Sequence, residues 1–135
     1  MNANQKATGM ADMKVRLSTL WVFVMINMLM ADIVTFMNPG ALGQMIAGDM
    51  GFQVTQEILL VFSILLEIPI VMILLSRVLN HRANRWANMI AGVITILFVI
   101  GGGSPYLSYI FFATIEVVSM AFIIWQAWKW TAQEA

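Results

Sequence analysis

Four long apolar segments constrain this chain more than any other feature of its sequence. They cover about residues 17–37, 55–79, 84–102 and 105–129. Each is long enough to cross a bilayer, which takes roughly 20 mostly apolar residues in a helix. None shows sustained alternation of polar and apolar residues, as the strands of a transmembrane barrel do. We therefore predict an all-α fold: a four-helix transmembrane bundle within residues 17–130.

The overall composition points to lipid as the solvent of this bundle. Hydrophobic residues make up 61% of the chain and charged residues only 10%, whereas soluble domains are about 25% charged. Seven basic and seven acidic residues balance, so no basic excess indicates nucleic acid as a partner. The chain has no cysteine, which excludes disulfides and thiolate metal sites. The expected partner is the bilayer, with no metal and no cofactor.

The polar segments divide the chain into one membrane domain with two short tails. Residues 1–16 and 131–135 are expected to be the tails, and residues 38–54 form a Gly-rich connection that could contain a short helix around Ala41–Ala47. The other two connections are short turns. Short connections make neighbouring helices antiparallel, so the prediction is an up-down-up-down bundle.

The distribution of Lys and Arg predicts how the bundle is oriented. The basic residues are Lys6, Lys14, Arg16, Arg77, Arg82, Arg85 and Lys129. All seven fall on one side of the predicted bundle, and basic residues near helix ends favour the cytoplasmic side. Both termini are therefore expected in the cytoplasm. The five Trp residues lie near the same side, where interfacial anchors are expected.

Two glutamates lie deep within predicted helices. Glu67 and Glu116 are each about eleven or twelve residues from the outer start of their helices, or roughly 16–18 Å into a core of ~30 Å. A charged acid at the bilayer centre costs about 2.5–3.5 kcal/mol on insertion scales. We therefore expect both side chains to face the bundle interior, either protonated at neutral pH or holding a cation. Protonated glutamates that only join helices by hydrogen bonds are the alternative.

Other polar residues lie where they could complete an acidic centre. Ser63 shares a helix face with Glu67, and Tyr109 shares one with Glu116. The predicted proton- or ligand-binding residues are Glu67, Glu116, Asp32, Asn27, Ser63, Tyr109 and Thr95. Asn27, Ser63 and Thr95 could instead be polar residues used in helix packing.

Several motifs resemble those of a known family. They are residues 55–60 (TQEILL), 66–69 (LEIP), 84–88 (NRWAN) and 110–116 (IFFATIE). With them, the chain from Lys14 to Trp130 resembles a family of small bacterial four-span membrane proteins that is known only as a domain of unknown function. The resemblance implies four spans in a bacterial inner membrane and no particular activity. More loosely, Glu67 followed by Arg77 is similar to DoxX-like four-helix proteins, which are often linked to respiratory or quinone chemistry.

Three functions are compatible with a buried acidic centre. The first is a small proton-coupled transporter, or a binder of amphipathic cations, with Glu67 and Glu116 as its site. The second is a non-catalytic subunit or assembly factor whose polar faces meet another membrane protein, with Glu67 or Glu116 paired to a cation of that partner. A homodimer is a separate possible assembly. The third is a lipid-modifying enzyme that uses the paired glutamates as general acid and base. The sequence favours the first and leaves enzymatic activity undecided.

Overall fold

Helices dominate the computed structural model, which describes residues 2–131. The helices are α1 (Ala3–Phe36), α2 (Ala41–Ala47), α3 (Gln56–Val78), α4 (His81–Gly101) and α5 (Leu107–Lys129). Within the described residues the only strand-like pairing is an isolated bridge between Asp49 and Gln53. By length and composition, α1, α3, α4 and α5 could each cross a membrane. The prediction of an all-α protein with four candidate membrane-spanning helices is confirmed, and these helices indicate a multi-pass membrane protein.

Polar side chains set where three of the long helices begin. Thr55 Oγ1 accepts a hydrogen bond from the amide of Ile58, and Asn80 Oδ1 accepts one from the amide of Ala83. Asn2 forms a capping box with Gln5, so α1 begins at Ala3 rather than near residue 17. Most of the segment that was expected to be an N-terminal tail is therefore helical.

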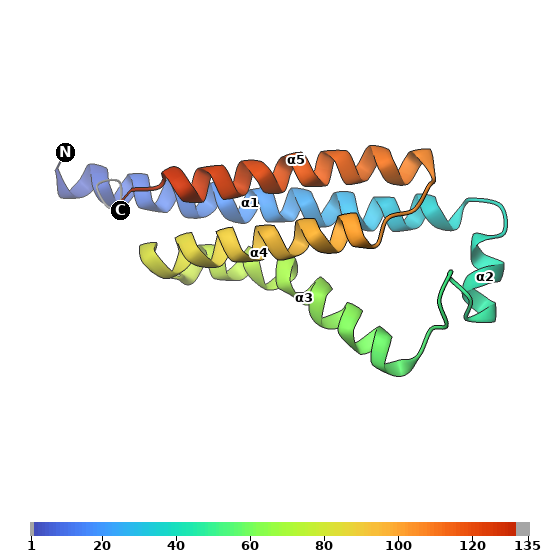
Figure 1. Cartoon of the computed structure of the whole chain (residues 1–135). Coiled ribbons are helices and arrows are strands. Elements are labelled where there is room, and N and C mark those ends of the chain that lie inside the picture. Colours follow the sequence, from blue (N-terminus) through green and yellow to red (C-terminus); the bar gives the residue numbers. More distant parts are fainter. Residues whose placement is uncertain (1, 132–135) are drawn as a thin grey trace.

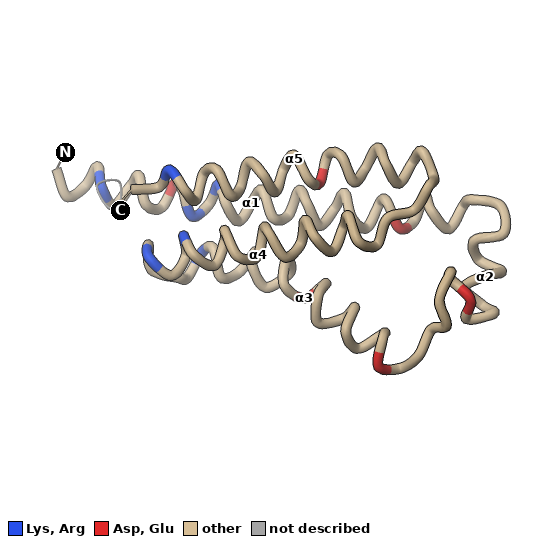
Figure 2. The backbone as a smooth tube through the Cα atoms, viewed as in Figure 1, with Lys and Arg blue, Asp and Glu red and all other residues tan. Residues whose placement is uncertain are grey.

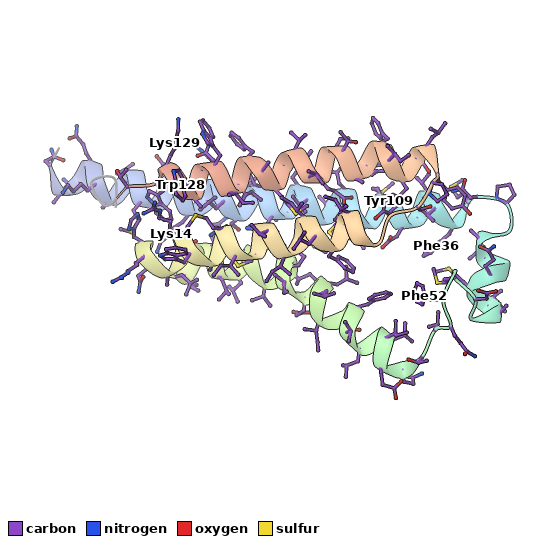
Figure 3. The ribbon with its side chains drawn as sticks, in the orientation of Figure 1. Lys14, Phe36, Phe52, Tyr109, Trp128 and Lys129 are labelled. Carbon is purple, nitrogen blue, oxygen red and sulfur yellow. The ribbon has the colours of Figure 1, made fainter. Side chains whose placement is uncertain are left out.

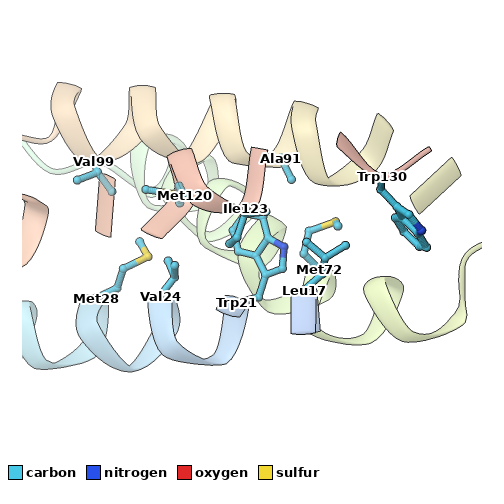
Figure 4. Close-up of a cluster of buried hydrophobic side chains, with 10 residues drawn as sticks. All are labelled: Leu17, Trp21, Val24, Met28, Met72, Ala91, Val99, Met120, Ile123 and Trp130. Carbon is cyan, nitrogen blue, oxygen red and sulfur yellow. The ribbon is translucent and has the colours of Figure 1, made fainter. Parts of the chain in front are cut away.

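The four long helices form a ring in which each packs against two others. α1 contacts α3 and α5, and α4 contacts the same two helices. Figure 1 shows that α1 begins at the end of the bundle where α5 ends, while α2 lies beyond the opposite end. The centre of the ring is filled by buried apolar side chains. Figure 4 shows them: Leu17, Trp21, Val24, Met28, Met72, Ala91, Val99, Met120, Ile123 and Trp130.

α3 changes direction near its middle, and its first half leans away from the bundle (Figure 1). Pro69 lies inside this helix and is buried. Proline has no amide to bond to the carbonyl of Leu65, and its ring crowds that carbonyl, which bends the helix. Residues 59–64 are consequently all exposed, whereas Met72 and Ser76 beyond the bend are buried.

A buried network of polar side chains joins α1, α3 and α4 near the end where α1 begins. Asn88 Oδ1 accepts hydrogen bonds from Trp21 Nε1 at 2.7 Å and from Ser76 Oγ at 3.3 Å. Asn88 Nδ2 donates to Asn84 Oδ1 at 2.6 Å, and Asn84 Nδ2 donates to the Ser76 carbonyl at 2.7 Å. Asn84, Asn88 and Ser76 are fully buried. Because each amide has partners on other helices or within α4, the network fixes how these helices are aligned.

Two of the five tryptophans do not lie where the sequence analysis placed them. Trp21 and Trp130 are completely buried, so their assignment as interfacial anchors is wrong. Trp21 is held inside by its hydrogen bond to Asn88. Trp86, Trp125 and Trp128 are exposed, as an interfacial role requires.

We predict that Asn88→Leu lowers the free energy of unfolding by about 1–3 kcal/mol, because it leaves Trp21 Nε1 buried without a partner. Thermal or denaturant unfolding in mild detergent would measure the change. Ser63→Ala is the control, since Ser63 is exposed and bonds only to its own helix; its effect should stay within about 0.5 kcal/mol. Equal stability of Asn88→Leu and the unsubstituted protein would contradict this view of the network.

Candidate functional site

The basic residues are confined to one end of the bundle (Figure 2). The seven Lys and Arg residues gather at the end where α1 begins and α5 ends, which we term the basic end. There Arg85 donates to the carbonyls of Ala127 and Trp128 at 3.0 and 2.9 Å, which satisfies the C-terminus of α5. Lys129 lies 4.3 Å from the ring centre of Trp125. Figure 3 shows Lys129 and Trp128 projecting outward at this end.

Glu116 is the one buried acid among the described residues. Its side chain is 3% exposed, and its Oε1 has no hydrogen-bond partner. Glu116 lies nine residues after the start of α5, about 14 Å along the helix and far from the basic end. A buried carboxyl oxygen without a partner is costly in a protein interior, which makes Glu116 the centre of the candidate site.

Thr95 lies at about the same depth as Glu116 on the neighbouring helix. A Cβ added to Gly92 would meet the side chain of Ile124 and the carbonyl of Met120, so Gly92 is where α4 and α5 approach closely. Thr95 lies one turn after Gly92 in α4, and Glu116 lies one turn before Met120 in α5. Both steps lead away from the end of the bundle that carries the basic residues. Thr95 is 1% exposed, and its Oγ1 also has no partner. Thr95 and Glu116 thus each bury an oxygen without a partner, at a similar depth on neighbouring helices.

Asp32 and Tyr109 lie on the side of Glu116 away from the basic end. Both are close enough to Glu116, and to each other, to interact electrostatically. The Tyr109 hydroxyl donates to the carbonyl of Val99 at 2.8 Å, and Figure 3 shows this residue near the far ends of α4 and α5. Asp32 is itself exposed. The structure thus brings together Glu116, Thr95, Tyr109 and Asp32, from three helices.

Asn27 and Ser63 do not join this group. Asn27 Nδ2 donates to the carbonyl of Phe23 at 2.9 Å, and Ser63 Oγ donates to that of Leu59 at 2.8 Å. Each bond returns to the preceding turn of the same helix. Both side chains are therefore satisfied locally, as polar residues on lipid-facing helices often are.

The expectation that Glu67 faces the bundle interior is wrong. Glu67 is exposed, whereas Pro69, Met72 and Ser76 form the buried face of α3. Glu67 precedes Pro69 by two residues, a rotation of about 200°, and so lies on the opposite face. Glu67 and Glu116 consequently do not form the pair that a general acid and base would need. Exposed to lipid, a charged Glu67 would cost about 2.5–3.5 kcal/mol.

A surface groove of about 350 Å³ lies between α4 and α5 at their far ends, and Glu116 itself does not line it. It is lined by Val99, Ile100, Gly103, Ser104, Tyr109, Ile110, Ala113, Thr114, Val117 and Val118. Ala113 and Val117 flank Glu116 along α5, so the groove ends near the depth of the buried carboxyl. The sequence analysis missed the groove, although the Gly-Gly-Gly-Ser turn and the small residues of α5 are a signal for it.

The chemistry open to this site is binding of a proton or a cation. Among the described residues, no three His, Asp or Glu side chains are grouped so as to hold a metal ion. Glu116 supplies a carboxyl, Thr95 a hydroxyl and Asp32 a second acid. No Lys or Arg lies near this depth, because all seven are at the basic end.

Comparison with known proteins gives a family without an assigned activity. Residues 9–135 match the family described as "Family of unknown function (DUF6326)". The chain belongs to this family. No curated protein and no solved structure matches the chain. The family membership agrees with the resemblance found in the sequence, and the DoxX-like similarity gains no support from it.

We predict that Thr95→Val raises the free energy of unfolding of the ligand-free protein by about 1 kcal/mol, since it replaces a buried, unpartnered hydroxyl with a methyl group of similar size. Thermal unfolding in detergent would measure this. Thr114→Val is the matched control, because Thr114 is exposed and its hydroxyl already bonds to the carbonyl of Ile110. A clear loss of stability in Thr95→Val would mean that its hydroxyl has a partner within the fold.

Proposed function

We propose that this protein binds a proton or an amphipathic cation at Glu116 and acts as a small proton-coupled transporter or cation binder of the bacterial inner membrane. The observation that carries the proposal is the Oε1 of Glu116, which is buried in a candidate membrane-spanning helix without a hydrogen-bond partner. The proposed site contains one buried glutamate, Glu116. Its second acid is Asp32, whereas the sequence had predicted Glu67.

The surroundings of Glu116 favour a mobile positive charge. An ionised carboxylate in a bilayer needs a partner of opposite charge, and the protein's own Lys and Arg residues lie at the far basic end. A proton or a bound cation can supply that partner. The Thr95 hydroxyl lies at the same depth and has no other bond to make, so it could hydrogen-bond either form of the carboxyl.

The groove between α4 and α5 fits an amphipathic ligand better than a small inorganic cation. Its lining is almost wholly apolar, and it reaches the residues that flank Glu116. The apolar part of a ligand could lie in the groove while its positive group approaches Glu116, with Asp32 adding negative charge nearby. Such a ligand would compete with the proton for one carboxyl, which is the requirement for proton-coupled transport.

The proposed orientation places the basic end, and with it both termini, in the cytoplasm, and the bundle is then up-down-up-down. Basic residues at one end and none in the two connections at the other support this orientation. Protons and ligand would then enter the site from the outer half of the membrane.

We predict that, in intact cells, a membrane-impermeant maleimide labels Gln53→Cys but labels Thr8→Cys only after permeabilisation. The chain has no native cysteine, so each variant reports a single position. Both side chains are exposed and lie at opposite ends of the bundle. Labelling of Thr8→Cys in intact cells would show that the orientation is opposite to the proposed one.

We predict that tetraphenylphosphonium, a lipophilic cation, raises the thermal stability of the purified protein at neutral pH and does so less at low pH. At 100 times its Kd a ligand should stabilise the protein by about 2.7 kcal/mol. Lowering the pH should weaken the effect, because protons compete for the same carboxyl. Glu116→Gln should abolish the stabilisation at every pH.

Glu67→Gln is the matched control for this experiment. It makes the same chemical change in an acid that lies outside the proposed site, so it should respond to the cation as the unsubstituted protein does. Stabilisation that survives in Glu116→Gln, or is absent from the unsubstituted protein across a panel of lipophilic cations, would contradict the proposal.

A further inference from the structure

α3 carries a polar face that points away from its own bundle. Gln56, Leu60, Ser63 and Glu67 lie at spacings of four, three and four along one side of the helix, and all four are exposed. We term these residues the α3 outer face. The opposite side of the helix, represented by Met72, is the one that packs against the bundle.

Glu67 makes this face costly to expose to lipid. Glu67 lies in the middle of a candidate membrane-spanning helix, where lipid offers no hydrogen bonds and no counter-ion. Intramembrane acids therefore face a protein partner or a water-filled cavity. The chain itself cannot supply a cation here, because its Lys and Arg residues are all at the basic end.

We propose that the α3 outer face is the contact surface between two copies of this protein, related by a two-fold axis along the membrane normal. In such a dimer each residue on the axis meets its own equivalent at the same depth. The amide of Gln56 can both donate and accept a hydrogen bond, the Ser63 oxygen can still accept one while its proton bonds to the Leu59 carbonyl, and a carboxyl group can share a proton with an equivalent carboxyl. The face is thus complementary to itself and needs no cation.

The bend at Pro69 makes this face accessible to a second bundle. It carries the first half of α3 away from the other helices, so that Leu60 and Ile64 are 61% and 58% exposed. A neighbouring α3 can then approach without meeting α1 or α4 first. Leu60 would add apolar packing beside the polar contacts, and Ser63 is small enough to let the two backbones come close.

The absence of native cysteine allows a direct test in native membranes. We expect Ser63→Cys to form a disulfide-linked species of twice the 15.1 kDa chain mass under mild oxidation, at least ten times faster than Thr114→Cys. Thr114 is a close match: both residues lie seven positions after the start of their helix, are exposed, and donate a hydrogen bond one turn back. Equal rates for the two variants would overturn the proposal.

Substitution of Glu67 tests the part played by the carboxyl. In the Ser63→Cys background, Glu67→Gln should retain the cross-linking rate because an amide also donates and accepts, whereas Glu67→Leu should reduce it several-fold. Circular dichroism and a single elution peak would show that each variant is folded. A cross-linked product of another mass, identified as a different membrane protein, would overturn the dimer and assign the face to that partner. The test does not involve Glu116 and is independent of the proposed cation site.

Discussion

The amide of Asn88 is the interaction on which the arrangement of the helices depends. It accepts from Trp21 of α1 and Ser76 of α3 while it donates to Asn84 within α4. Helices in lipid gain little from apolar contact with each other, because lipid tails are as apolar as their side chains. Directional hydrogen bonds can therefore select one alignment of the helices where apolar packing alone would allow several. The network lies near the basic end, where Asn84 and Ser76 are close to the ends of α4 and α3.

The far end of the bundle has the opposite character. α3 bends away at Pro69, a shallow surface groove runs between α4 and α5, and Glu116 and Thr95 each keep an unpartnered oxygen. The polar network near the basic end is satisfied, although Trp130 Nε1 at that end has no partner, whereas Glu116 and Thr95 have none within the fold.

The sequence was sufficient for the features that depend on local composition. The long apolar runs alone place α3, α4 and α5 within three residues of their observed bounds. Whether an individual side chain faces the core or the lipid depends on tertiary packing, and the sequence alone did not predict this. Glu67 was expected inside because of its depth, but the buried face of α3 is set by Met72 and Ser76. Trp21 was expected at the interface because of its position, and its hydrogen bond with Asn88 places it in the core instead.

The length of α1 has a consequence for the surroundings of the protein. Its 34 residues extend for about 51 Å, whereas the hydrocarbon core of a bilayer is about 30 Å thick. About 20 Å of continuous helix, carrying Lys6, Asp12 and Lys14, must therefore stand beyond the hydrocarbon layer at the basic end. A rigid arm of this kind holds the first turn of α1 at a distance from the hydrocarbon layer. Tilting of α1 within the bilayer would move the far end of this arm over a long distance. Small rearrangements among the helices would therefore become large displacements of the arm.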